Sequence, residues 1–310
     1  MLARIVKAMR SKQGRRDIRY AVSMILNPFT RKLGYTIVAD HFYQPIPNDR
    51  EVRVYHNRER PIDSIEWKIE CQLELVSELL GRYRDEFNQK HVISSCGYSE
   101  ETSALISGDA EFLYSMVRHM KPRRVIEIGG GGSTQITAAA LRMNFRDLEK
   151  TEFVCIDPYP RDFLKDFSDR YGEFMRFRLL EMPVQLVDLS LFDSLGENDI
   201  LFVDSSHVFK QGSDVEFEFL RIYPILTKGV IVHLHDMFFP FDYPIEWNLK
   251  RYLFWNEQYF LEAFLQFNSK FEVLASLSMV AYHDNSTFMD SIEVYDETKK
   301  PGSFWMRVAN

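Results

Sequence analysis

The sequence feature that most constrains the fold is a run of four glycines at positions 129–132. A short segment with three apolar residues, 124–128, precedes it, and the segment 133–141 that follows begins with Ser133, a residue that favours helix starts. This order predicts a strand, a tight turn and the beginning of a helix. Glycine permits positive φ and close approach of a ligand, and a helix N-terminus offers free N–H groups. The segment therefore indicates either a cofactor-binding turn or a purely structural one.

Short apolar runs alternate with helical stretches beyond position 122, which is typical of β-α-β units and a parallel sheet. Helical spacing of apolar residues predicts a helix at 65–87. A second helix is predicted to begin with Ser107 or Asp109 as its N-cap and to end at His119. The predicted strands lie at 124–128, 153–156, 177–180, 200–203 and 230–234, with two later ones at 271–277 and 304–308.

The charge of the chain is unevenly distributed. Its formal net charge is −7, yet residues 1–32 contain nine Lys or Arg and only one acid, Asp17. The acidic remainder argues against a nucleic-acid enzyme. We expect the basic segment to be a solvated helical arm, and its apolar residues Leu2, Ile5, Val6 and Met9 leave contact with an anionic membrane surface open.

The location of the protein is predicted from what the sequence lacks. With 45% hydrophobic residues, the 310-residue chain can bury a substantial core. We find no apolar stretch long enough to cross a bilayer and no signal-peptide pattern. The three cysteines, Cys71, Cys96 and Cys155, match neither a disulfide framework nor a paired metal motif. We therefore expect a soluble, cytoplasmic protein.

The residues around the glycine run separate two kinds of cofactor site. A dinucleotide-binding turn needs G-x-G-x-x-G, but the last position falls on Thr134 or Gln135, so an NAD site is disfavoured. The chain has instead an acid and two glycines in the order Glu127-x-Gly129-x-Gly131. Asp157 ends the next predicted strand, where a carboxylate can accept both ribose hydroxyls or can simply begin an Asp-Pro turn.

Several longer segments resemble one subgroup of the class I S-adenosylmethionine (SAM)-dependent methyltransferases, the subgroup called methyltransferase domain 24. The chain is also distantly similar to macrocin-type sugar O-methyltransferases and to cephalosporin-hydroxylase-like proteins. The segments that carry the resemblance are 41–47, 108–114, 126–129, 157–160, 199–207, 233–236 and 255–259.

This resemblance implies a Rossmann-like α/β fold with a seven-stranded sheet of order 3-2-1-4-5-7-6 and a helical N-terminal extension. We expect residues 1–104 to form the basic arm and a helical covering region, and residues 105–310 to form the SAM-dependent methyltransferase domain. In such a domain the cofactor SAM would be bound by Glu127, Gly129, Gly131, Ser133, Asp157 and Asp204.

The same strand order places polar residues together. Asp204 follows the fourth strand and Asp236 the fifth, with His207 and His235 close to them in sequence. Carried over from the macrocin-type enzymes, Asp204, His235 and Asp236 become ligands of Mg²⁺ or another divalent metal, and His207 becomes the general base, with Asp204 also in the catalytic set. The relatives have an acid where this chain has His235, so Mn²⁺, Fe²⁺ and Zn²⁺ are alternatives. Asp204 and Asp236 could also merely cap a helix and anchor a loop.

The resulting hypothesis is methylation of a hydroxyl oxygen on a small molecule or sugar. Aromatic residues near this region, among them Tyr43 and Trp255, could line the acceptor pocket or belong to the core. Two other functions stay open: a metal-dependent oxygenase that uses His207, His235 and a carboxylate, and a non-catalytic SAM-binding subunit. The sequence also leaves open whether the protein is a homo-oligomer.

Overall fold

The computed structural model describes residues 12–38, 44–57, 62–89, 93–99, 105, 108–145, 149–292 and 300–310, and of residues 12–20 the backbone alone. The chain divides into two compact units. Unit 1 contains residues 1–58 and 244–254, and unit 2 contains residues 59–243 and 255–310. Residues 1–11 and Tyr43, which the sequence singled out, lie outside the described residues. The predicted domain boundary at 104/105 stays a prediction.

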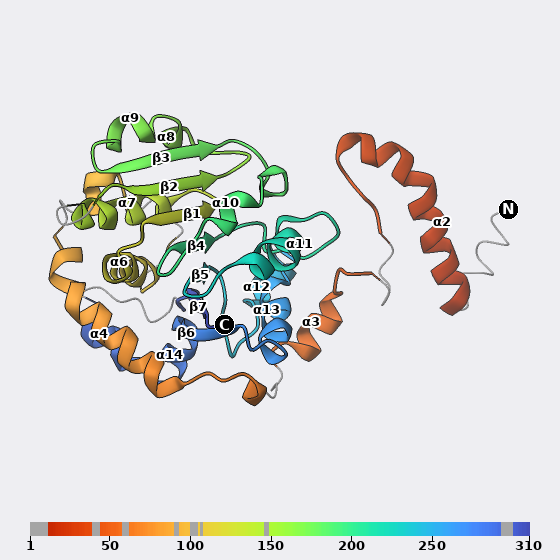
Figure 1. Cartoon of the computed structure of the whole chain (residues 1–310). Helices are drawn as coiled ribbons and strands as arrows, with labels where there is room; N and C mark the ends of the chain where they lie inside the picture. Colours follow the sequence, from red (N-terminus) through yellow and green to blue (C-terminus); the bar gives the residue numbers. More distant parts are fainter. Residues whose placement is uncertain are drawn as a thin grey trace. The chain divides into compact units, whose positions relative to one another are not determined.

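Unit 2 is built on a seven-stranded sheet of order β3-β2-β1-β4-β5-β7-β6, which confirms the predicted order. Figure 1 shows the strands side by side in this sequence. β7 runs antiparallel to both β5 and β6, and the other paired strands are parallel. The strands are β1 (Arg124–Ile128), β2 (Thr151–Ile156), β3 (Met175–Leu180), β4 (Ile200–Val203), β5 (Ile231–Leu234), β6 (Phe271–Ser276) and β7 (Phe304–Val308).

Helices cover both faces of this sheet. Along β2, Phe153 and Cys155 join one core cluster, and Val154 and Ile156 join the other, as the two-residue period of a strand requires. The helices are α4 (Ile69–Phe87), α6 (Asp109–Met120), α7 (Gly132–Asn144), α8 (Asp162–Lys165), α9 (Phe167–Tyr171), α10 (Ser190–Asp193), α11 (Asp214–Phe217), α13 (Glu257–Gln266), α14 (Leu277–His283) and α15 (Ser286–Ser291), with short turns η2 (Ile62–Ser64), η3 (Ser94–Cys96), η4 (Val184–Leu186), η5 (Glu218–Ile222) and η6 (Tyr223–Ile225).

Unit 1 contains α2 (Lys12–Thr30), η1 (Arg31–Leu33), α3 (Asp49–Tyr55) and α12 (Ile245–Leu249). The segment after α2 is held by Asn27, whose side chain accepts from the Ile37 N–H at 2.8 Å and donates to the Ile37 carbonyl at 2.9 Å. Asn48 and Glu51 form a capping box at the start of α3, which packs against α12. No helix in the described part of the chain combines the length and the apolar character needed to span a membrane.

Two helix starts differ from the prediction. The first helix begins at Ile69 and not at residue 65, because Lys68 has a φ of 50°. This left-handed conformation does not occur inside a right-handed α-helix. Ile65 is nevertheless buried, in the core cluster on the other face of the sheet from α4. In α6, Gly108 occupies the N-cap position and its N–H donates to Glu111 at 2.7 Å. Asp109 is therefore no cap, and Ser107 lies outside the described residues.

Asp109 is committed to a distant part of the chain. It is fully buried, and its carboxylate accepts from the backbone N–H groups of Gly302 and Ser303 at 2.8 to 3.1 Å. These contacts join α6 to the segment just before β7. The sequence did not show this, because an acid at a helix start has an ordinary local explanation as a cap.

Residues 244–254, which belong to unit 1, lie in the chain between two aromatic residues of unit 2 that pack on each other. We call this segment the excursion. The chain leaves after Tyr243 and returns at Trp255, and their ring centroids are 5.9 Å apart at 84°. The Tyr243 hydroxyl also accepts from the backbone N–H of Gln258 at 3.1 Å. The two ends of the excursion are thus joined within unit 2.

The sheet brings Gly129 against the chain that follows β4. Gly129 has a φ of 86°, and a Cβ placed there would lie 2.0 Å from the Asp204 carbonyl oxygen. Both facts require glycine, since side chains are strained at this φ and a backbone oxygen cannot give way easily.

We predict that Gly129→Ala destabilises the protein by at least about 2 kcal/mol, because the strained φ alone accounts for about 1 to 2 kcal/mol and the clash adds to it. The matched control is Gly81→Ala in α4, where a Cβ meets nothing within 4 Å. The control should stabilise the helix by up to about 1 kcal/mol. Urea unfolding of both variants measures this, and equal stability of the two would contradict the packing described for Gly129.

Candidate functional site

The strand register places the candidate residues in one row. Ile128 pairs with Ile156 and with Val203, and Val203 pairs with Leu234. Since these residues end β1, β2, β4 and β5, the next residue of each strand lies at the same edge of the sheet. Those residues are Gly129, Asp157, Asp204 and His235.

Backbone hydrogen bonds fix this row. The N–H of Gly129 donates to Ile156, that of Asp204 to Ile128 and that of His235 to Val203, at 2.9 to 3.0 Å. Each residue is thus the last one held by the neighbouring strand, and the side chains of Asp204 and His235 lie at the carboxyl edge of the sheet. Ligands of open α/β sheets bind at this edge where the strand order reverses, which here is between β1 and β4.

Glu127 organises the start of α7 from inside the sheet. It is 1% exposed, and its two carboxylate oxygens accept from the hydroxyls of Ser133 at 2.5 Å and Thr134 at 2.6 Å. Burial raises the pKa of Glu127 to about 8, although the two hydroxyls oppose the rise. Ser133 therefore contacts Glu127, and Thr134, which no sequence pattern singled out, is the second partner.

Asp157 ties the end of β2 to the glycine turn. One carboxylate oxygen accepts from the N–H of Gly130 at 3.1 Å, and the other accepts from the N–H of Tyr159 at 2.7 Å. The second contact is the turn that Asp-Pro sequences favour, and the first is a link to the neighbouring strand. A Cβ on Gly130 would meet Leu164 and Cys155 within 2.7 Å, whereas one on Gly131 meets nothing closer than Arg161 at 3.9 Å. The open side of the turn is therefore at Gly131.

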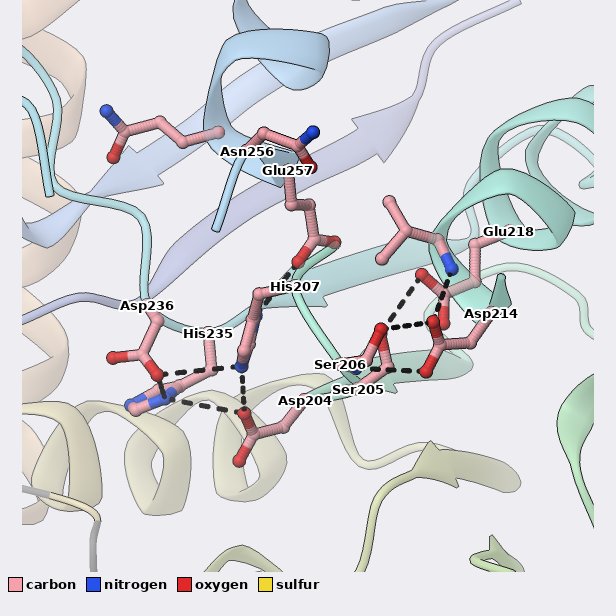
Figure 2. A network of polar contacts seen from close by, with 12 residues as sticks. Asp204, Ser205, Ser206, His207, Asp214, Glu218, His235, Asp236, Asn256 and Glu257 are labelled. Atoms are coloured by element: carbon pink, nitrogen blue, oxygen red, sulfur yellow. Dashed lines mark hydrogen bonds and ion pairs between the residues drawn. The ribbon is translucent and has the colours of Figure 1, made fainter. Parts of the chain in front are cut away.

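Asp204, His207 and Asp236 converge, with ligating atoms within 4.8 Å of one another. His207 Nε2 lies 3.2 Å from a carboxylate oxygen of Asp204 and 3.6 Å from one of Asp236. Figure 2 shows His207 from above and His235 from the side directed at the same two carboxylates. His235 Nδ1 lies 3.9 Å from Asp204 and 3.7 Å from Asp236. Both histidines thus approach the same pair of carboxylates, although only His207 belongs to the group of three whose ligating atoms all lie within 4.8 Å.

Each imidazole has a further carboxylate on its other nitrogen. His207 Nδ1 lies 2.9 Å from Glu257, and His235 Nε2 lies 3.4 Å from Asp109. Glu257 and Asp109 are both buried and come from α13 and α6. Both residues lie in segments that carry the resemblance, 108–114 and 255–259, but no local pattern showed that either acid would face a histidine.

The acids around the two histidines shift the pKa values of His207 and Asp204. Burial lowers the pKa of His207, but the hydrogen bonds to Asp204 and Glu257 raise it by more, to about 10. Burial raises the pKa of Asp204, but His207 and His235 lower it by more, so that it stays below its ordinary value. In the cation-free chain at neutral pH, these shifts favour the imidazolium form of His207, with a proton on both nitrogens, and the ionised form of Asp204.

Two of these residues have strained backbones. His207 has a φ of 58° and Asp236 a φ of 59°. Such conformations are uncommon outside glycine and cluster at functional sites. Asp204 does not cap the helix that follows it, because the N-cap of α11 is Ser213, whose side chain accepts from the Glu216 N–H. The alternative in which Asp204 serves as a helix cap is therefore wrong.

The aromatic residues near this region fall into different environments. Phe239 is fully buried and packs on Trp67 and Phe304 in the core. Trp255 instead lies against His207, with ring centroids 4.2 Å apart. Of the predicted aromatic lining, Trp255 is thus the member that the described contacts bring directly to the polar cluster.

Comparisons with known proteins give the family. Residues 126–237 match the sequence model of a methyltransferase domain. An uncharacterised protein of Archaeoglobus fulgidus is 33% identical over 179 residues, which cover 55% of this chain and 78% of that protein. Among solved structures, an S-adenosylhomocysteine (SAH)-bound methyltransferase from Podospora anserina has a TM-score of 0.42 and 15% identity, covering 84% of this chain and 93% of its own.

A second solved structure is an O-methyltransferase of tomaymycin synthesis from Streptomyces achromogenes, in complex with SAM, with a TM-score of 0.43 and 14% identity over 84% of this chain and 96% of its own. The family match covers the end of β1, the glycine turn and the strands up to β5, and thus contains Gly129, Asp157, Asp204, His207 and Asp236 but neither Asp109 nor Glu257. The chain belongs to this methyltransferase-domain family and is a class I SAM-dependent methyltransferase.

Proposed function

We propose that this methyltransferase transfers the methyl group of SAM to a hydroxyl oxygen of a small molecule or sugar, assisted by a divalent cation. The observation that carries the proposal is the convergence of Asp204, His207 and Asp236 at the edge that the glycine turn shares. A sulfonium methyl group is already activated, so the protein must align the acceptor and remove its proton. A hydroxyl is a weak acid, and this cluster provides both anionic oxygens and an imidazole.

The donor atoms fit a divalent cation. Ligands at about 2.1 Å from an octahedral cation lie about 3.0 Å apart when adjacent and about 4.2 Å apart when opposite. In the proposed ligand set, the distances from His235 Nδ1 to the carboxylate oxygens of Asp204 and Asp236 are 3.9 and 3.7 Å, between these two values. Carboxylates suit Mg²⁺, and the added imidazole suits Mn²⁺ as well.

The roles that we propose follow the strand ends. Asp204, His235 and Asp236 would hold the cation, and Nε2 of His207 would accept the acceptor's proton. A bound cation would polarise the hydroxyl and weaken the attraction of Asp204 for the proton on His207. Glu127, Gly129, Gly131, Ser133 and Asp157 would form the SAM site, with Asp204 at its border.

We predict that Asp157→Ala weakens SAH binding by about 1 to 3 kcal/mol, because ribose hydroxyls would lose their acceptor and Gly130 would lose its side-chain partner. The matched control is Asp162→Ala, which removes a nearby exposed acid. Titration calorimetry with SAH measures both variants. Parent-like affinity of Asp157→Ala would remove this residue from the cofactor site.

We predict that His207→Ala lowers methyl transfer by about 10²- to 10⁴-fold, the usual contribution of a positioned base, while SAH affinity stays at the parent value. Asp204→Asn and Asp236→Asn should abolish the response to added Mg²⁺ or Mn²⁺, because an amide is a poor ligand for a hard cation. SAH release with a panel of nucleotide sugars and catechols measures turnover, with Asp193→Asn in α10 as the control.

The outcomes separate the proposed roles. Full parent activity in chelator, or in all three site variants, would overturn the cation-and-base mechanism. Loss of SAH affinity in Asp204→Asn alone would assign Asp204 to the cofactor and not to the cation. Oxygen consumption that depends on Fe²⁺, without methyl transfer, would favour the oxygenase alternative.

A further inference from the structure

The segment 255–258 begins α13 and contacts both loops that carry the polar cluster. Its backbone N–H groups at Asn256 and Glu257 donate to the His207 carbonyl at 3.0 and 3.2 Å. The Asn256 side chain accepts from the Phe209 N–H at 2.6 Å. On the other side, Gln258 accepts from the Phe238 N–H at 2.6 Å, two residues after Asp236. The segment therefore supports the loops after β4 and β5 together.

Within this segment Glu257 contacts the imidazole of His207 directly. Its carboxylate lies 2.9 Å from Nδ1, and the side chain is 1% exposed. Figure 2 shows Glu257 on one end of the ring and Asp204 on the other. The Trp255 ring packs against the face of the same imidazole. The ring is thus restrained at one edge by a buried acceptor and on one face by an aromatic side chain.

We propose that Glu257 is the positioning residue of His207: it accepts the Nδ1 proton and so directs Nε2 at Asp204 and Asp236. This inference rests on the proposed function, in which Nε2 receives the acceptor's proton. An imidazole presents one nitrogen for chemistry only when the other is engaged, and a buried carboxylate both fixes the ring and increases its basicity. A solvent-exposed partner would do this less well, because water would compete for the same nitrogen.

Asp109 does not act on His235 in the same way. Its distance to His235 Nε2 is 3.4 Å, and its oxygens already accept from Gly302 and Ser303. Replacing Asp109 would therefore disturb the segment before β7 as well as the imidazole. Glu257 offers the cleaner test, because within the described contacts its side chain is hydrogen-bonded to His207 alone.

The first experiment needs neither acceptor nor cation. In ¹⁵N-labelled protein, a hydrogen-bonded Nδ1 proton of His207 should give a downfield, slowly exchanging resonance. Its loss in His207→Ala assigns it to this residue, and coupling of its nitrogen to a single ring C–H proton assigns it to Nδ1 and not to Nε2, which faces Asp204. We expect the signal in the parent and in the control Glu262→Gln, which alters another buried glutamate of α13. Glu257→Leu should abolish it, and Glu257→Gln should retain it, because the amide oxygen still accepts a hydrogen bond. Its absence from the parent, or its persistence in Glu257→Leu, overturns the proposal.

The second experiment measures turnover. Glu257→Leu should lower kcat by about 10- to 100-fold, the loss seen when a metal-ligating histidine loses its outer carboxylate, with SAH affinity unchanged. In the His207→Ala background the same change should have no further effect, because residues that act as a unit are not additive. Independent losses in the two backgrounds would show a merely structural role. Methyl transfer that does not need His207 would overturn the proposed base, and the resonance of Nδ1 would still report on Glu257.

Discussion

Alignment of the last residues of β1, β4 and β5 is the constraint on which the site depends. Because Ile128, Val203 and Leu234 are in register, the residues that follow them leave the sheet at one level. Asp204 and His235 are then fixed by main-chain hydrogen bonds to the neighbouring strand and not by their own side chains. Short parallel strands buried on both faces can hold such a register, since a slip would expose apolar residues. The glycine at 129 follows from it, because the chain after β4 leaves no room for a side chain.

The sequence predicted the parts of this arrangement that depend on local pattern. Short apolar runs separated by helical stretches located all seven strands to within about two residues, and the acids that end two of them converge as expected. What the sequence could not show are contacts between distant segments. Glu257 lies 50 positions from His207, and Asp109 lies 193 from Gly302. Each acid has an ordinary explanation near a helix start, so only the packed structure reveals its partner.

Considered by itself, the polar cluster lowers the free energy of unfolding. It gathers acids on the buried side of two histidines and holds His207 and Asp236 at positive φ. Removing charges from water and straining the backbone both oppose folding, by about 1 to 3 kcal/mol for each strained residue. The sheet and its two apolar layers must therefore be stable enough to impose this geometry. Such localised strain and charge in an otherwise regular α/β fold are expected at a site where function limits stability.

The contact between Tyr243 and Trp255 has a consequence for changes in the length of the segment between them. An inserted segment whose two ends already meet adds little loop-closure entropy, and that entropy rises only slowly with length. Changes in the length of residues 244–254 should therefore cost the sheet of unit 2 little, whereas they would alter the packing of α12 on α3.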